Sequence, residues 1–212
     1  MRTEQGFVLT EPTIVADNPL GLFRKISQYV LSHHLKEEGK RLALMSELLD
    51  PMHRRHIEAL QILRPGVRTL EVGSGNGSIS AWLAERVSPG GAAVVFDLDL
   101  SLIKVRAPNL EMRQGDIVAG PVECGRFNLV IARAVLHHVS DAEAAINNLV
   151  ASLRPGGTLL LIEPDFLPVS IAEPLAIRAF WRVWLAWSRE RGIDHHRAKP
   201  RTSTRSTRSK PN

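Results

Sequence analysis

The sequence predicts an α/β fold, with a doubly wound and mostly parallel sheet preceded by helices. Residues 69–87 read as a buried strand, a glycine-rich loop and an amphipathic helix, which is the opening of a nucleotide-type βαβ unit. Four more apolar runs of strand length follow, separated by Pro/Gly turns or by helical patterns. A chain of 212 residues is long enough for one such domain with a real core.

The region before the first strand divides into two parts. Residues 1–17 show no clear period and are expected to be flexible, whereas residues 18–66 follow a helical pattern and are expected to cover the ligand site. Within the second part, Asp50-Pro51 predicts the start of a new helix, with Asp50 as N-cap and Pro51 at the first helical position.

The glycine loop discriminates between ligand classes. Gly73, Gly75 and Gly77 alternate, so the spacing does not fit the G-x-G-x-x-G fingerprint of dinucleotide binding. Glu71 lies directly before the loop, where a carboxylate would repel a pyrophosphate but would suit a ligand that carries an ammonium group. Both observations disfavour an NAD-dependent enzyme.

The run Glu71-Val-Gly-Ser-Gly-Asn-Gly77 resembles motif I of the class I S-adenosylmethionine-dependent methyltransferases, and further motifs extend the resemblance over about residues 40–165. The resemblance implies a Rossmann-like methyltransferase fold with strand order 3-2-1-4-5. It also implies S-adenosylmethionine as cofactor, bound outside the carboxyl ends of the first and fourth strands. The alternative interpretation is a glycine turn in an unrelated α/β protein.

An acidic residue follows the second expected strand, residues 92–97. Asp97 lies 20 residues after Gly77, an offset at which a carboxylate can accept hydrogen bonds from both ribose hydroxyls. Leu98 would then lie against the adenine. Asp99 is better explained as the N-cap of the next helix, although it is close enough to join the site.

The third and fourth expected strands, residues 109–114 and 127–132, lead into two more motifs of the family. The resemblance implies that Asp116 accepts from the adenine amine and that the following apolar residue packs on the ring. The segment from Arg133 resembles the one that closes over the methionine end of the cofactor. The expected cofactor-binding residues are therefore Glu71, Gly73, Ser74, Gly75, Asn76, Gly77, Asp97, Leu98, Asp99, Gly115, Asp116, Ile117, Ala132 and Arg133.

His137 and His138 are the candidates for a catalytic role. A histidine near the sulfonium could deprotonate an incoming hydroxyl or amine, or one ring could pack at the rim while the other faces solvent. A metal site is not expected at His53 and His56, since no nearby carboxylate or cysteine completes a ligand set; solvated histidines are the simpler interpretation.

The second half of the α/β region ends with a helix, a strand and another helix. Ser140-Asp-Ala-Glu143 is a capping box, and a Pro-Gly-Gly turn leads from that helix into the fifth strand, residues 158–163. Pro174 opens a helix that holds three tryptophans at a spacing of three residues, for which core packing and an apolar substrate pocket are the two interpretations. The α/β domain is expected to span residues 67–192.

Residues 193–212 are expected to form a disordered basic tail. Residues 189–212 hold eight basic and two acidic side chains, a net charge of +6, whereas the whole chain carries +5. The family's sheet normally continues with two more strands, and this composition cannot form them. The chain is therefore interpreted as a shortened variant or as one whose reading frame departs near Gly192. Its bare fifth strand is expected to reduce activity and solubility or to pair in a homodimer.

These observations predict an S-adenosylmethionine-dependent methyltransferase acting on a small-molecule acceptor, with a truncated, non-catalytic cofactor-binding remnant as the alternative. A nucleic-acid partner is not expected, because the basic tail lacks interleaved aromatic residues. A membrane partner is not expected either, since no apolar run approaches spanning length. One cysteine and no signal-peptide pattern favour a cytoplasmic protein.

Overall fold

A computed structural model describes residues 36–166, 173–191 and 193 of the chain. Its described part holds one five-stranded sheet with the order β3-β2-β1-β4-β5, in which every neighbouring pair is parallel. The predicted fold class and strand order are confirmed. The strands are β1 Arg68–Val72, β2 Ala92–Asp97, β3 Leu110–Gln114, β4 Phe127–Arg133 and β5 Leu153–Ile162; the helices are α1 Glu38–Ala59, α2 Ser78–Val87, α3 Ala142–Ser152 and α4 Leu175–Glu190.

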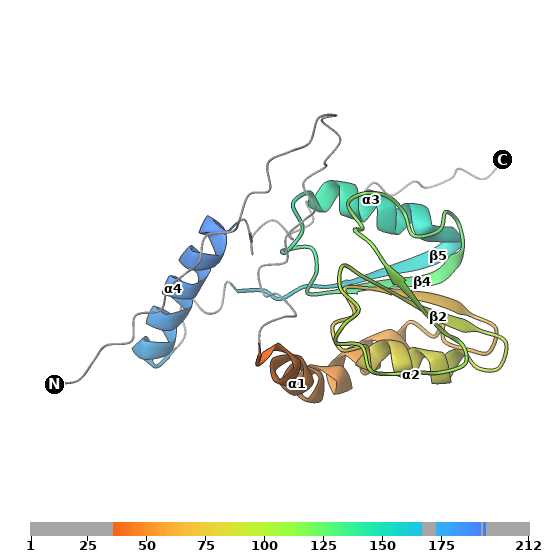
Figure 1. The fold of residues 1–212 in the computed structure, drawn as a ribbon, viewed down its shortest axis with the longest axis horizontal. Coiled ribbons are helices and arrows are strands. Elements are labelled where there is room, and N and C mark those ends of the chain that lie inside the picture. Colours follow the sequence, from red (N-terminus) through yellow and green to blue (C-terminus); the bar gives the residue numbers. More distant parts are fainter. Residues whose placement is uncertain (1–35, 167–172, 192, 194–212) are drawn as a thin grey trace, which may run out of the picture.

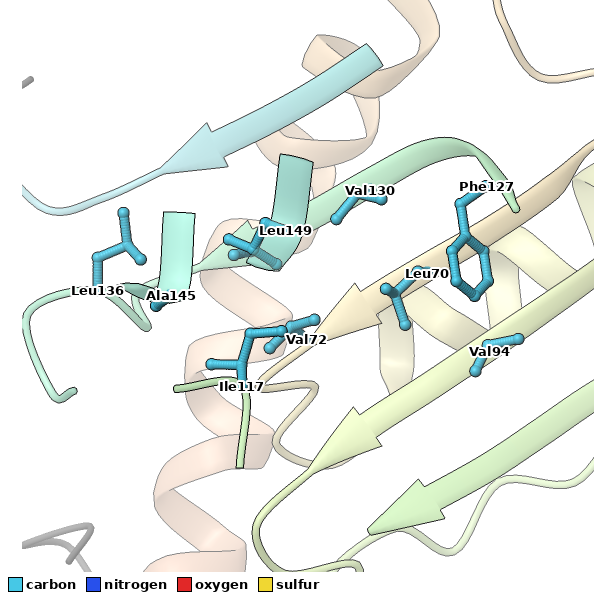
Figure 2. Packing of buried hydrophobic residues seen from close by; sticks show 10 residues of the cluster. Leu70, Val72, Val94, Ile117, Phe127, Val130, Leu136, Ala145 and Leu149 are labelled. Atoms are coloured by element: carbon cyan, nitrogen blue, oxygen red, sulfur yellow. The ribbon is translucent and has the colours of Figure 1, made fainter. Parts of the chain in front are cut away.

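The core lies on both faces of the central strands β1 and β4, which are buried along nearly their whole length. On one face Leu70 and Val130 pack with Leu149 of α3, as Figure 2 shows. Helix α2 covers the other face (Figure 1). Its Ile79 and Leu83 form a second buried cluster with Leu129 and Ile131 of β4, among others. Two-sided burial explains why the sequence reads as continuous apolar runs, as it must in a parallel sheet covered by helices.

The predicted helix start at Asp50-Pro51 is wrong. Helix α1 continues through Pro51, and the Asp50 side chain is buried and ion-paired instead of capping a helix. A proline costs an internal helix one hydrogen bond. Here the helix retains its anchors on either side of that point, because Asp50 and Ile57 are both buried against the domain.

Two smaller expectations also change. The residue that caps α3 is Asp141, whose carboxylate accepts a hydrogen bond from the amide of Ala144 at 2.9 Å, and not Ser140. No helix lies between β2 and β3 in the described residues, so Asp99 does not cap one. Its carboxylate instead accepts from the amide of Ser101 at 2.8 Å, which closes a tight turn.

Helix α4 stands apart from the sheet, on the side where β5 ends (Figure 1). Its tryptophans do not enter the core, so core packing is the wrong interpretation for this helix. Within the described residues no helix combines the length and apolar composition that crossing a bilayer requires. The expected flexible segment 1–17 and the tail from residue 194 lie outside the described residues.

Candidate cofactor and acceptor site

The glycine loop joins β1 to α2 and is shaped by close contacts. Gly73, Gly75 and Gly77 all have positive φ, as expected for glycine. A Cβ atom on Gly73 would collide with the side chain of Val135, which follows β4. The loop after β1 and the loop after β4 therefore meet at the carboxyl edge of the sheet, at the switch point where ligands bind in such folds.

Asp97 at the end of β2 faces this loop, as predicted. Its Oδ2 accepts from the amide of Gly75 at 3.3 Å, and its Oδ1 lies 3.4 Å from the amide of Asp99. The carboxylate is half-buried beside the glycines. The structure thus brings together the loop and the acidic residue that the sequence assigned to one site.

Helix α1 covers the loop from the solvent side. Oδ1 of Asn76 accepts from the hydroxyl of Ser46 at 3.1 Å and from the amide of Ser78 at 3.2 Å. Leu42 lies 3.4 Å from the position that a Cβ on Gly75 would take. Ser74, buried in the same loop, has a hydroxyl with no hydrogen-bond partner among the described residues.

The three predicted residues after β3, which are Gly115, Asp116 and Ile117, have different surroundings. Phe96 packs against Gly115, where a Cβ would lie 2.6 Å from the ring. Asp116 accepts from the amide of Val118 at 2.8 Å. Ile117 is 4% exposed and belongs to the core beside Val72, as Figure 2 shows. Ala132 is likewise fully buried in β4.

Glu71 is the counter-ion of Arg133. Its Oε1 lies 2.9 Å from both Nε and Nη2 of Arg133, and its Oε2 accepts from the hydroxyl of Ser80. Burial raises the pKa of Glu71, while the guanidinium and the hydroxyl act in the opposite direction. The sequence predicted that this carboxylate would suit the ammonium group of a ligand. In the structure both of its oxygens contact side chains of the protein itself.

Arg133 also binds α1. Its Nη1 lies 3.1 Å from Oδ1 of Asp50 and 2.9 Å from Nδ1 of His53. Burial opposes the charged guanidinium, but Glu71 and Asp50 outweigh it and raise the pKa of Arg133. Burial and then Arg133 lower the pKa of His53, so its ring accepts the hydrogen bond in the neutral state. His53 is therefore not the solvated histidine that was expected.

A second polar pair links the ends of β4 and β5. Nδ1 of His137 lies 2.6 Å from Oε2 of Glu163, and both side chains are largely buried. The other oxygen of Glu163 accepts from the amides of Val135 and Leu136, each at 2.9 Å. Sequence reasoning identified His137 and missed Glu163. The signal was available, since Glu163 ends the strand next to the one that leads to His137.

Aromatic side chains adjoin this pair. The ring of Phe166 lies 6.4 Å from that of His137 and 5.6 and 5.9 Å from the rings of Trp181 and Trp184 on α4. The ring of His138 lies beside that of His137, tilted by 42°, with 3.9 Å between the ring centroids. A largely buried histidine bound to a carboxylate thus lies beside an apolar, aromatic surface.

No group of three or more histidine, cysteine, aspartate or glutamate side chains in the described part of the chain is arranged to hold a metal ion. The polar side chains pair with one another instead, as Arg133 does with Glu71 and His137 does with Glu163.

The fold and the loop define a Rossmann-like ligand-binding domain with its site at the β1–β4 switch point. Residues 70–161 match the family model described as the methyltransferase domain. This match covers the chain from β1 to β5 and agrees with the predicted resemblance to the class I S-adenosylmethionine-dependent methyltransferases and with the predicted cofactor.

Two curated relatives and two solved structures place the domain among known proteins. An uncharacterized 37.1 kDa protein in a Streptomyces fradiae transposon is 33% identical over 117 residues, which is 52% of this chain and 34% of that protein. The ubiquinone/menaquinone biosynthesis C-methyltransferase UbiE of Pseudomonas putida is 32% identical over 133 residues, 57% of this chain and 52% of that enzyme. This chain thus spans about a third to a half of their lengths.

The solved structures support the fold. A methyltransferase candidate from Bacillus halodurans C-125 superposes with a TM-score of 0.51 at 22% identity, covering 66% of this chain and 60% of that one. A SAM-dependent methyltransferase from Aquifex aeolicus does so with a TM-score of 0.50 at 18% identity, covering 59% and 72%.

Proposed function

We propose that this chain transfers a methyl group from S-adenosylmethionine to a small, planar, largely apolar acceptor that loses a proton during the reaction. The observation that carries the proposal is the His137–Glu163 pair, which lies at the carboxyl edge of the sheet beside an aromatic cluster. When bound, the cofactor supplies a methyl group that is already activated on a sulfonium. The protein then has to position the acceptor, exclude water and receive a proton.

The residues around the glycine loop fit this cofactor. Asp97 offers two carboxylate oxygens for the ribose hydroxyls, and Ser74 has a buried hydroxyl without a partner among the described residues. The three glycines of the loop allow close approach to its backbone. We assign cofactor binding to the glycine loop, Asp97, Leu98 and Asp116, and assign Glu71 and Arg133 to supporting the loop from beneath.

His137 is the proposed proton acceptor. Because its Nδ1 donates to Glu163, its basic nitrogen is Nε2. Glu163 also binds two amides of the loop that carries His137, so one carboxylate sets both the ring orientation and the loop position. A histidine held in this way can accept the proton of an acidic C–H or O–H group of the acceptor. The acceptor loses this proton when its carbon or oxygen atom forms the bond to the methyl group.

The acceptor class is argued from the aromatic side chains. Phe166, Trp181 and Trp184 offer flat apolar faces near His137 and few polar atoms, which favours a planar ring over a sugar or a peptide. The Pseudomonas relative is a C-methyltransferase of quinone biosynthesis, which supports carbon as the acceptor atom.

Two measurements test the proposal. Calorimetry should give micromolar or tighter binding of S-adenosylhomocysteine, with no competition from NAD. Transfer of labelled methyl to a panel of phenols, quinols and 1,3-dicarbonyl compounds should then depend on His137. His137→Gln should bind the cofactor normally and lose at least about a hundredfold in turnover, which is the scale of general base catalysis. The solvent-exposed His56→Gln is the matched control.

Other results would contradict the proposal at separate points. Comparable NAD binding would exclude the cofactor assignment. Cofactor binding without turnover of any acceptor would support the alternative of a non-catalytic remnant. Turnover that survives His137→Gln would leave the methyltransferase assignment intact and remove the proposed base.

A further inference from the structure

Exposed apolar side chains gather on one helix outside the core. Five of the large hydrophobic side chains that stay exposed among the described residues lie on α4, with exposed fractions between 36% and 68%. They are Leu175, Ile177, Phe180, Val183 and Trp187. Residues 180, 183 and 187 have helical spacing and line one open apolar hollow together with Trp184. Exposed apolar side chains that gather on one helix in this way indicate a contact with another molecule.

The opposite side of α4 is basic. Arg178, Arg182 and Arg189 recur at spacings of four and seven residues, so they form one row along the helix. The helix is held to the described domain through Trp181 and Trp184, which contact Phe166, and this leaves Phe180 and its neighbours pointing outward. The helix is thus amphipathic, with part of its apolar side open.

Charge concentrates in the same part of the chain. Residues 173–212 contain ten Lys or Arg and three acidic residues, a net charge of +7, whereas the residues before them have a net charge of −2. The part of the sequence that contains α4 is therefore strongly basic. The occupant has to combine negative charge with an apolar interior.

A second copy of this chain does not fit that description. Pairing α4 with itself would cover the apolar sides but would supply no negative charge, because the two copies carry the same strongly basic segment. A nucleic acid fits only in part, because Leu175, Ile177 and Val183 have no flat ring on which a base could stack. A bilayer with anionic headgroups meets both requirements, since its interface accepts aliphatic and aromatic side chains and attracts arginine.

We propose that α4 attaches the protein to the surface of an anionic lipid bilayer. The helix lies in the plane of the interface, with Phe180, Val183 and Trp187 inserted among the lipids and the arginines at headgroup level. Attachment of this kind needs no membrane-spanning helix, and it differs from the sequence-based expectation of no membrane partner. The proposal does not depend on methyl transfer.

The test is sedimentation of the full chain with phosphatidylcholine vesicles, with and without phosphatidylglycerol. Binding should require the anionic lipid, weaken as salt rises and shift tryptophan emission to the blue. The double variant Phe180→Ser/Trp187→Ser should bind at least about tenfold more weakly, and Arg182→Gln/Arg189→Gln should weaken binding by a similar factor. Val150→Ser, which replaces an exposed apolar residue on α3, is the matched control and should bind like the parent.

Circular dichroism and a cooperative melt confirm that each variant is folded. Equal binding of the Phe180→Ser/Trp187→Ser variant and the parent would overturn the proposal, because attachment would then come from the basic segment after α4 alone. Equal binding to vesicles with and without phosphatidylglycerol would also overturn it. Two further results would overturn the proposal if the protein does not bind vesicles. One is tight binding to an oligonucleotide. The other is self-association that the Phe180→Ser/Trp187→Ser variant loses.

Discussion

Nδ1 of His137 lies 2.6 Å from Oε2 of Glu163 although 26 residues separate them in the sequence. The contact follows from the sheet, because β4 and β5 are parallel neighbours and Arg133 pairs with Ile162 in their register. The residues directly after the two strands therefore emerge side by side. Ala134, between β4 and the histidine, adopts a φ of 53°, an uncommon value for a residue other than glycine.

The first prediction concerns this pair. Glu163→Gln keeps the size of the side chain but removes the carboxylate that orients His137. Turnover should fall about tenfold to a hundredfold, with the affinity for S-adenosylhomocysteine unchanged. The double variant Glu163→Gln/His137→Gln should be no slower than His137→Gln alone, because two residues that act as a unit are not additive. Additive losses in the rate measurements would show that Glu163 acts independently of the histidine.

The second prediction concerns Asp97. If its carboxylate holds the ribose hydroxyls, Asp97→Ala removes up to two charge-assisted hydrogen bonds of about 1.5–3 kcal/mol each. Calorimetric titration with S-adenosylhomocysteine should show a loss of about tenfold to a thousandfold in affinity. Asp99→Ala is the matched control, since Asp99 closes a turn with Ser101. A larger loss for Asp99 than for Asp97 would mean that the two carboxylates are assigned the wrong way round.

The third prediction concerns the buried ion pair. Arg133→Met leaves the carboxylate of Glu71 buried without its counter-ion, and such a loss costs about 3–5 kcal/mol in free energy of unfolding. The double variant Arg133→Met/Glu71→Gln removes both charges and should recover much of that loss in urea titrations. The surface pair of Arg86 and Glu58 provides a control, because Arg86→Met should cost under about 1 kcal/mol. An Arg133→Met protein as stable as the parent would show that water reaches this pair.

The fold was largely readable from the sequence because its signals are local. Apolar runs such as residues 127–132 and the loop Gly73–Gly77 each identify an element without reference to the rest of the chain. Errors occurred where tertiary contacts overrode a local signal. Pro51 predicts a helix start, yet burial of Asp50 and Ile57 on either side keeps one helix continuous.

The site was predictable only in part. Asp97 and the glycine loop have a characteristic spacing, so their meeting followed from the sequence. The contacts of Glu71 with Arg133 and of His137 with Glu163 did not follow from the sequence. Each contact crosses between neighbouring strands and depends on the register of the sheet. Strand order alone gave a usable hint: charged residues at the carboxyl ends of neighbouring strands, such as Glu71 and Arg133, are placed to meet. This rule would have identified the pair of Glu71 and Arg133 and would have placed Glu163 at the same edge of the sheet.

The last prediction concerns pH. Burial and the neighbouring Arg133 lower the pKa of His53, with Asp50 opposing them. The unfolded chain therefore takes up a proton near the ordinary histidine pKa of about 6.5, while the folded protein does so only at lower pH. Between these two pKa values the unfolded state binds more protons than the folded state. The contribution of His53 to stability is therefore full above about pH 6.5 and is lost as the pH falls.

His53→Gln removes the titrating group and keeps a side chain that can accept from Arg133. The difference in unfolding free energy between the parent and this variant should be largest near neutral pH and should narrow as the pH falls below about 6.5. Taking the difference cancels groups common to both proteins, including Glu71, whose raised pKa acts in the opposite sense. Urea titrations across this range give the measurement, with exposed His56→Gln as the control. A difference that widens on acidification would mean that His53 is protonated in the folded protein and that Asp50, not Arg133, governs its charge.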